Sequence, residues 1–197
     1  MSPLNTAAPA PLPAPHGAQP PSAWIQRWSH LVPEGGAVLD VACGLGRHLR
    51  WFAQRRHPVV GVDCAPDAIA SIAPLGEAIL ADIENGPWPL PGRTFAGVVV
   101  TNYLWRPLLP TLVASVAPGG VLLYETFALG NETVGKPSRP DFLLRPGELL
   151  QACAGLRVVA YEDGFLAAPD RFVQRIAAVH EPLPADGTFG TVWRHAL

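Results

Sequence analysis

The sequence predicts an α/β domain built around a mostly parallel β-sheet. From about residue 24 onward, short apolar runs alternate with stretches of helical periodicity, which is the order of a repeating strand and helix fold. A turn with two glycines follows the first apolar run, and acidic residues stand at or near the ends of the first three runs. Because the carboxyl ends of parallel strands meet at one edge of a sheet, these turns and acids predict a ligand site at that edge.

Length and composition favour a single domain. The chain has 197 residues, of which 49% are apolar and 15% are charged, and no apolar run approaches the roughly 18 residues that span a bilayer. Residues 1–21 are rich in Pro and Ala and are expected to be a disordered tail. Residues 22–180 are expected to form the domain, and residues 181–197 a terminal extension.

Charge and cysteine content limit the classes of partner and ligand that the chain is expected to bind. The formal net charge is −2 and the basic residues are scattered, which argues against a nucleic-acid partner and gives no sign of a membrane surface as one. The three cysteines are odd in number and lack Cys-x-x-Cys spacing, so neither a disulfide framework nor a metal site is expected. A cytoplasmic location fits this composition, and the oligomeric state is left open.

A short amphipathic helix is expected over residues 24–32, before the first strand. Trp24 and Trp28 share one of its sides with Leu31 or Val32, and Pro33 ends it. This helix either closes over the site or covers the sheet.

The first strand leads into a glycine turn. Residues 38–41 suit a strand buried on both faces, residues 42–46 form the turn, and a helix is expected to continue to about residue 56. Gly44 and Gly46 have no Cβ, so the backbone can adopt positive φ and a ligand can lie directly against it. The free N–H groups of the following helix would point at that ligand.

The second and third strands also end at acids. Residues 58–62 form an apolar run that reaches Asp63, and residues 78–80 form a shorter run that reaches Asp82. A carboxylate at the end of the second strand of such a unit can accept hydrogen bonds from the hydroxyls of a ribose. The alternatives for Asp63 are a cap on the helix expected over residues 66–72 or a solvated loop acid.

The motif from Asp40 to Gly46 reads Asp-x-x-x-Gly-x-Gly. It departs from the Gly-x-Gly-x-x-Gly fingerprint of nicotinamide and flavin folds, because Leu49 stands where their third glycine would be. Together with the acids after the next two strands, it resembles the first motifs of class I S-adenosylmethionine-dependent methyltransferases.

This resemblance implies S-adenosyl-L-methionine as the cofactor, and it implies that each motif binds one part of that molecule. Asp40 and the glycine backbone would hold the amino-acid end, Asp63 the ribose, and Asp82 with Ile83 the adenine. Arg27 is a candidate for the cofactor carboxylate, with a solvated arginine as the alternative. The cofactor-side residues are thus Asp40, Ala42, Cys43, Gly44, Gly46, Asp63, Cys64, Asp82, Ile83, Asn102 and Arg27.

The fourth strand, expected over residues 95–101, runs into a polar and aromatic segment. Tyr103, Trp105 and Arg106 are the first candidates for contact with the methyl acceptor, because ligands bind outside the carboxyl ends of such strands. Packing against the core or the cofactor is the alternative for the two aromatic residues. The segment that begins at Asn102 only loosely resembles the Asn-Pro-Pro-Tyr motif of amino-group methyltransferases, because it lacks the two prolines. This segment therefore does not indicate nitrogen methylation.

A long irregular stretch follows the fifth strand. A helix over residues 107–117 and a strand over residues 121–126 precede it, and residues 127–145 are expected to form a lid, since loops of this length in a compact domain are usually functional or disordered. Phe142, Leu143 and Leu144 would anchor it. The charged residues that could reach the acceptor, or simply be solvated, are Arg139, Asp141 and Arg145.

Two final strands, expected over residues 156–161 and 171–179, complete the layout as a hairpin. Five strand-helix units followed by an antiparallel hairpin resemble the class I methyltransferases over residues 24–180. The resemblance implies a Rossmann-like, seven-stranded sheet with helices on both faces and an antiparallel last strand.

The expected function is transfer of a methyl group from S-adenosyl-L-methionine to a small-molecule acceptor. The methyl group arrives activated, so alignment matters more than a catalytic dyad, no catalytic residue is assigned, and His48 and His57 are read as structural or surface residues. The segment from Arg139 to Glu148 is similar to small bacterial methyltransferases of the tellurite-resistance and thiopurine type, which would imply a soft S, Se or Te nucleophile. Alternatives are an RNA or protein acceptor, or a module that binds the cofactor or a nucleotide without catalysis.

Overall fold

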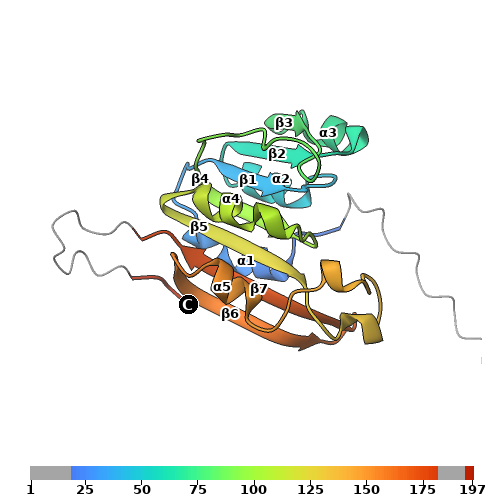
Figure 1. Cartoon of the computed structure of the whole chain (residues 1–197). Coiled ribbons are helices and arrows are strands. Elements are labelled where there is room, and N and C mark those ends of the chain that lie inside the picture. Colours follow the sequence, from blue (N-terminus) through green and yellow to red (C-terminus); the bar gives the residue numbers. More distant parts are fainter. Residues whose placement is uncertain (1–18, 182–193) are drawn as a thin grey trace, which may run out of the picture.

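The computed structural model describes residues 19–181 and 194–197. They contain one seven-stranded sheet with the order β3-β2-β1-β4-β5-β7-β6 (Figure 1). β1 to β5 are parallel, and β7 runs antiparallel between β5 and β6, which confirms the predicted sheet and its reversed last strand. The strands are β1 (Val38–Val41), β2 (Val59–Asp63), β3 (Glu77–Leu80), β4 (Phe95–Thr101), β5 (Val116–Phe127), β6 (Arg157–Leu166) and β7 (Arg171–Val179).

Helices cover both faces of the sheet, as expected. Buried side chains from α1, α2 and α3 pack on one face, and those from α4 and α5 pack on the other. The α-helices are α1 (Ala23–Trp28), α2 (Arg47–Ala53), α3 (Pro66–Ile72), α4 (Leu109–Ala114) and α5 (Glu148–Ala152). Short 3-10 helices are η1 (Ser29–Leu31), η2 (Arg106–Leu108), η3 (Asn131–Thr133) and η4 (Pro140–Phe142).

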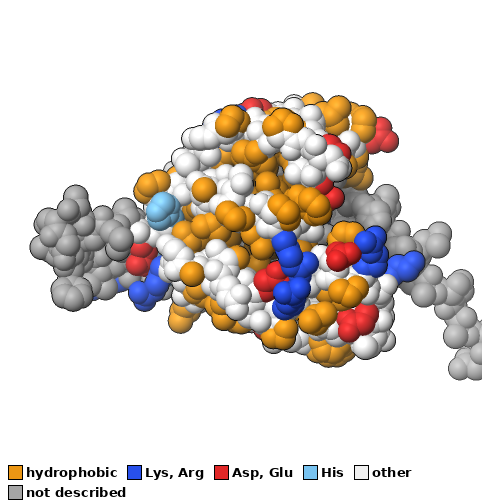
Figure 2. Space-filling model, viewed as in Figure 1, with side chains coloured by type: hydrophobic (Ala, Val, Ile, Leu, Met, Phe, Trp, Pro, Cys, Tyr) orange, Lys and Arg blue, Asp and Glu red, His pale blue; other side chains and the backbone are white. Residues whose placement is uncertain are grey.

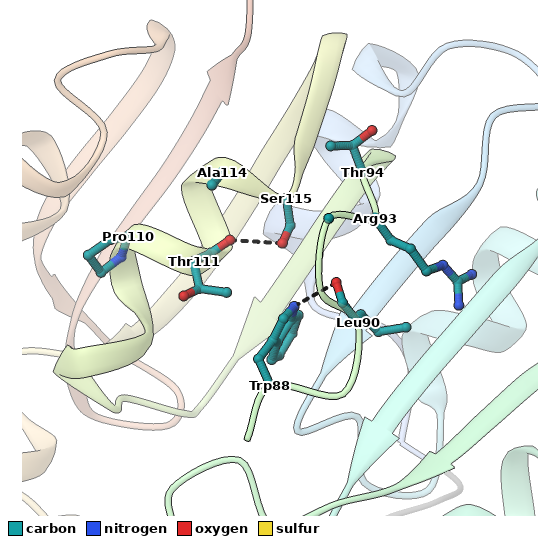
Figure 3. Close-up of a pocket in the computed structure, with 9 residues that line it drawn as sticks. Trp88, Leu90, Arg93, Thr94, Pro110, Thr111, Ala114 and Ser115 are labelled. Atoms are coloured by element: carbon teal, nitrogen blue, oxygen red, sulfur yellow. Dashed lines mark hydrogen bonds between the residues drawn. The ribbon is translucent and has the colours of Figure 1, made fainter. Parts of the chain in front are cut away.

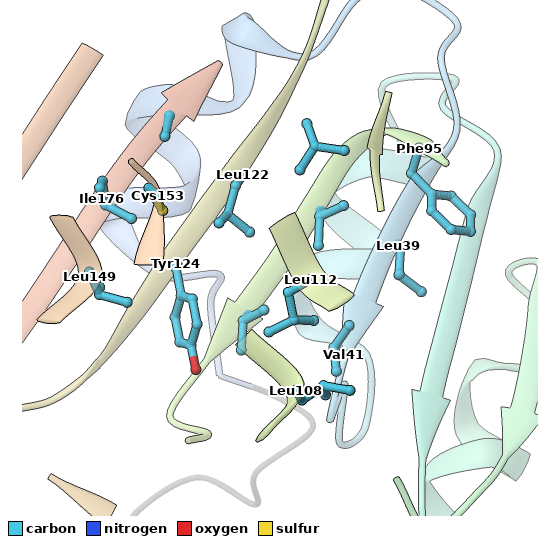
Figure 4. Packing of buried hydrophobic residues seen from close by; sticks show 14 of the residues in the cluster. Leu39, Val41, Phe95, Leu108, Leu112, Leu122, Tyr124, Leu149, Cys153 and Ile176 are labelled. Carbon is cyan, nitrogen blue, oxygen red and sulfur yellow. The ribbon is translucent and has the colours of Figure 1, made fainter. Parts of the chain in front are cut away.

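The alternation of side chains along β1 divides the core. Leu39 and Val41 are fully buried among the residues beneath α4 and α5, whereas Val38 is buried on the side of α1 and α2. Figure 4 shows the first of these clusters, in which Leu112 of α4 and Leu122 of β5 lie among the strand residues. β1 has apolar neighbours on both faces, which explains why its sequence is a continuous apolar run broken only by Asp40.

The strand order reverses at β1, which lies between β2 and β4. Val41 is in register with Val62 of β2 and with Val100 of β4, so the carboxyl ends of these three strands are level. Open α/β sheets bind ligands at this switch point, outside the carboxyl ends of the strands.

Several element boundaries differ from the sequence prediction. α2 ends at residue 53 rather than near 56, and α4 is shorter than the expected 107–117 because β5 begins already at residue 116. The expectation of five strand-helix units is wrong in one place, since turns without a helix connect β3 to β4. The segment there is rich in Pro and Gly, which disfavour a helix.

The predicted terminal segments fall mainly outside the described residues. Residues 1–18 of the expected tail and residues 182–193 of the expected extension are not described. Within the described ranges, no helix has both the length and the apolar character needed to cross a bilayer.

Candidate functional site

The backbone turns sharply at the carboxyl ends of β1 and β4. Ala42, directly after β1, has φ of 53°, and Asn102, directly after β4, has φ of 55°. Non-glycine residues seldom adopt this left-handed region, and those that do cluster at functional sites. Both residues line one cavity, so the two strained positions of adjacent strands form a single feature.

The two glycines of the turn serve different purposes. Gly44 has φ of 52°, and a Cβ added there would meet no atom within 4 Å. Gly46 has φ of 81°, and a Cβ there would collide with the side chain of Ile72 in α3. Gly46 therefore allows α2 and α3 to pack closely, whereas Gly44 leaves open space against which a ligand can lie.

Asp63, at the end of β2, holds the turn in place. Its Oδ2 atom accepts a hydrogen bond of 2.8 Å from the backbone N–H of Gly44, and Oδ1 accepts one of 2.9 Å from the N–H of Ala65. The second contact lies just before α3, but the N-cap residue of that helix is Ala65, so Asp63 does not have the alternative role of helix cap. Each carboxylate oxygen has a further lone pair, and the side chain is only partly buried, so it can also accept hydrogen bonds from a ligand.

Asp40 belongs to a buried polar chain. Its carboxylate is 1% exposed, and Oδ2 lies 3.5 Å from Nδ1 of His48 with no hydrogen-bond partner in the described part of the chain. Nε2 of His48 accepts a hydrogen bond of 3.3 Å from the backbone N–H of Ser22, so the proton of the neutral ring is on Nδ1, facing Asp40. Ser22 Oγ in turn donates to Glu125 Oε1 at 2.9 Å. This chain fixes the segment before α1 to the ends of β1 and β5.

A polar cavity of about 210 Å³ lies between the glycine turn and the end of β4. Its lining is formed by Gln19, Ala42, Cys43, Gly44, Leu45, Arg47, His48, Thr101 and Asn102. Arg47 contributes a guanidinium group to the lining, and its Nη1 atom donates a hydrogen bond of 3.4 Å to Gln19 Oε1. Burial lowers the pKa of this guanidinium, although the negative charges of Asp40 and Glu125 act to raise it. Arg47 is thus a candidate for binding a ligand carboxylate.

Arg27, the arginine selected from the sequence, is exposed and lies 4.8 Å from the ring of Trp28, outside the lining of this cavity. Sequence reasoning missed Arg47 and did not foresee that His48, expected to be structural or at the surface, is buried beside this cavity. Their position in the first turn after the glycines was the available signal, because that turn faces any ligand bound to the glycine backbone.

The two cysteines of this region differ in accessibility. Cys43 is buried, and burial, with smaller contributions from Asp40 and Asp63, raises the pKa of its thiol, so the thiolate needed for nucleophilic attack is disfavoured. Cys64 is exposed.

The acid after β3 is in an exposed turn. Asp82 Oδ1 accepts hydrogen bonds from the backbone N–H groups of Glu84 and Asn85, and Oδ2 accepts one from the side chain of Asn85. These bonds, led by the one from the Asn85 side chain, lower the pKa of Asp82. Ile83 is half-buried and packs against the core.

A second cavity, of about 260 Å³, adjoins the first at Asn102, which lines both. Its other lining residues are Glu84, Tyr103, Leu104, Thr126, Phe127, Pro137 and Phe142. Tyr103 is the one predicted acceptor-side residue in this lining, and its buried Oη atom has no hydrogen-bond partner in the described part of the chain. Burial and then the nearby charge of Glu84 raise the pKa of the Tyr103 phenol, so the group is a neutral hydroxyl.

Trp105 and Arg106 do not line this second cavity. Trp105 packs against the core, and Arg106 fastens the lid to α5 through four hydrogen bonds. Its guanidinium donates to both carboxylate oxygens of Glu148, at 2.6 and 3.0 Å, and to the carbonyl oxygens of Asp141 and Leu143.

The predicted lid is anchored at both ends. Leu143 and Leu144 are buried, and Asn131, 1% exposed, donates to Pro137 O and accepts from the N–H of Phe172 in β7. The lid charges, by contrast, face solvent: Arg139 and Asp141 pair with each other at 2.8 Å with about 70% of each side chain exposed, and Arg145 is exposed as well.

Two further cavities lie elsewhere. One of about 370 Å³, between Trp88, Thr94 and Ser115, is at the amino end of β4, the end of the sheet opposite the glycine turn (Figure 3). The other, of about 590 Å³, lies between α4 and α5. Neither is lined by residues of the glycine turn, so the two cavities that share Asn102 form the candidate site.

Part of the chain is similar to known proteins. Residues 38–120 match the family model of the methyltransferase domain. The chain is 35% identical over 111 residues to the ribosomal protein L11 methyltransferase of Burkholderia lata, covering 53% of this chain and 36% of that protein. It is 33% identical over 107 residues to the malonyl-[acyl-carrier protein] O-methyltransferase of Serratia marcescens, covering 49% and 40%. The chain therefore spans little more than a third of the length of these relatives.

Solved structures share the fold over a larger part of the chain. TehB from Haemophilus influenzae superposes with a TM-score of 0.62 at 18% identity, over 80% of this chain and 61% of that one. A TehB-like S-adenosylmethionine-dependent methyltransferase from Corynebacterium glutamicum has a TM-score of 0.58 at 17% identity, over 84% and 90%. The sheet order and the glycine turn of the chain thus accompany a match to the methyltransferase domain over residues 38–120.

Proposed function

We propose that the protein transfers a methyl group from S-adenosyl-L-methionine to a small-molecule acceptor, with residues 22–180 as the methyltransferase domain. The observation that carries this proposal is the pair of adjoining cavities at the switch point, one polar and bordered by the glycine turn, the other largely apolar. A cofactor bound across the turn would present its methyl group near Asn102, where the two cavities meet.

The residues of the first cavity fit the cofactor. The open space at Gly44 admits a ligand against the backbone, and Arg47 offers a cation to the cofactor carboxylate. Asp40 is buried and lies outside the cavity lining, and its unpartnered Oδ2 atom supports a role at the amino-acid end. Asp63 would accept hydrogen bonds from the ribose, and Asp82 with Ile83 would bind the adenine after some rearrangement of the Asp82 turn. The cofactor supplies an activated methyl group, and these residues hold and orient it.

The size of the second cavity supports a small acceptor. At about 260 Å³ it lies near the lower end of the range for small-molecule sites, and the lid residues Pro137 and Phe142 border it. On the face drawn in Figure 2, Lys and Arg side chains lie in small groups beside Asp and Glu rather than forming a continuous basic surface, which disfavours an RNA acceptor.

A protein acceptor is the second candidate, because several relatives that match about half of the chain are ribosomal protein L11 methyltransferases. The test is incubation with methyl-labelled S-adenosylmethionine and separate pools of small thiols, metalloid oxyanions, phenols, amines, bulk tRNA and ribosomal protein. We expect label in a small-molecule pool. Label confined to the protein or tRNA pool would contradict the proposal.

A further inference from the structure

The second cavity, lined by Glu84, Tyr103, Phe127 and Phe142 among others, has a distinct electrostatic character. The lining includes one carboxylate, that of the exposed residue Glu84, and three aromatic residues, and no arginine, lysine or histidine of the described residues contributes to it. The carboxylates that act on the Tyr103 phenol, Glu84 and Asp82, are both negative when ionised. An anionic acceptor in this cavity would therefore meet like charge with no compensating cation.

The nearest cation of the lid does not change this balance. Arg139 lies 5.2 Å from the ring of Phe142, but its guanidinium is paired with Asp141 Oδ2 at 2.8 Å and its side chain is 70% exposed. Arg106, the other arginine expected near the acceptor, has its donors engaged by Glu148 and two lid carbonyl groups. Arg106 is therefore engaged elsewhere, and Arg139 lies outside the lining of the cavity.

We infer, on the basis of the proposed function, that the acceptor is a small amine with an apolar body. A carboxylate combined with aromatic faces is the chemistry that recognises an ammonium group, through a charge-assisted hydrogen bond and cation–π attraction. The unpartnered hydroxyl of Tyr103 offers a second hydrogen-bond partner to the amine nitrogen. The cavity thus disfavours the metalloid oxyanions that the resemblance to tellurite-resistance enzymes suggested.

Atoms and charges balance in the methyl-transfer step without a basic side chain of the protein. The amine gives up a proton to water and presents its neutral nitrogen to the methyl group. The nitrogen lone pair forms the new N–C bond, and the pair of the breaking C–S bond stays on sulfur, leaving neutral S-adenosylhomocysteine. The positive charge passes from sulfur to nitrogen, and Glu84 stabilises it there as it does in the ammonium form that first binds.

The experiment compares three probes: phenylethylamine, phenylpropionate, which is of similar size, and selenite, which is smaller. Binding of each is measured by titration calorimetry to protein loaded with S-adenosylhomocysteine, and methyl transfer to each is measured with labelled cofactor. We expect binding and transfer for the amine alone. Glu84→Gln should lower kcat/KM for the amine about tenfold or more, the loss of a hydrogen bond to a charged group, and should weaken amine binding in the calorimeter. Glu34→Gln, an exposed acid at the opposite end of β1, should change neither.

The outcomes separate this inference from the proposed function. Failure of the protein to bind S-adenosylhomocysteine at all would overturn both. Normal cofactor binding with transfer only to phenylpropionate or selenite, or with no binding and no transfer of the amine, overturns the amine assignment alone. A loss of cofactor affinity in Glu84→Gln equal to its loss of amine turnover would place Glu84 in the cofactor site and likewise overturn it.

Discussion

At the scale of single residues, the two glycines of the turn make opposite predictions. Gly44→Ala places a methyl group in open space, so it should cost only the strain of a positive φ, about 1 kcal/mol in the free energy of unfolding. The same methyl group would occupy the space next to the bound cofactor, so the affinity for S-adenosylhomocysteine should fall strongly. Urea denaturation and titration calorimetry measure the two effects separately.

Gly46→Ala is the matched comparison. Its Cβ would collide with Ile72, so this variant should lose about 1–3 kcal/mol of stability beyond the strain, through overpacking of α2 against α3. A Gly44→Ala variant as unstable as Gly46→Ala, with cofactor affinity unchanged, would show that both glycines serve packing alone.

Asp63 combines a structural role with the proposed ligand role. Asp63→Asn keeps an oxygen for one backbone N–H but removes the charge, and it should weaken S-adenosylhomocysteine by about 2 kcal/mol, the range for a charge-assisted hydrogen bond. Asp67→Asn, at an exposed position in the same neighbourhood, should leave affinity intact. Equal affinities for the two folded variants would remove Asp63 from the cofactor site.

At the scale of elements, the pair of Arg106 and Glu148 joins η2, the lid and α5. Burial acts to raise the pKa of Glu148, but the hydrogen bonds from Arg106 and from the backbone N–H of Arg145 outweigh burial and hold the pKa below its ordinary value. A depressed carboxyl pKa means stability that is present above the unfolded pKa, about 4.3 for Glu, and lost as the pH falls through the lower folded pKa.

Glu148→Gln should therefore be less stable than the parent at pH 7, by about 1–2 kcal/mol for this partly buried pair, and the difference should shrink below about pH 4. Urea denaturation at both pH values measures it. Asp141→Asn, which breaks an exposed pair, should change stability little. A Glu148→Gln deficit that stays constant with pH would mean that the ion pair is not its cause.

The element order was largely predictable from the sequence, and the reason is visible in single strands. β1 is buried on both faces and β4 is nearly so, which is why each is a continuous apolar run in the sequence. The predicted bounds of both strands coincide with the observed ones. The start of β5 was missed because residues 116–120 contain Pro118 and two glycines, which indicate a turn. In the structure Val116 pairs with Phe95 of β4, and the backbone of the two glycines hydrogen-bonds to His180. Such pairing depends on neighbours distant in sequence, which local pattern cannot provide.

At the scale of the whole molecule, the sequence could predict only those parts of the candidate site whose positions the backbone determines. Gly44, Asp63 and Asn102 lie where the strand ends bring them, because strand order determines those positions. Side-chain partners were not predictable in the same way: Arg106 binds the lid and Arg47 lines the cavity, while Arg27 is exposed. Which of several arginines reaches a site depends on packing across three elements.

The central claim is that the glycine turn binds the sulfonium cofactor rather than a dinucleotide. Titration calorimetry of the full chain with S-adenosylhomocysteine and, separately, with NADH tests it most directly. We predict saturable binding of S-adenosylhomocysteine, a matching rise in Tm because a ligand of the native state stabilises it, and no heat with NADH. Tight binding of NADH together with no heat from S-adenosylhomocysteine would contradict the assignment.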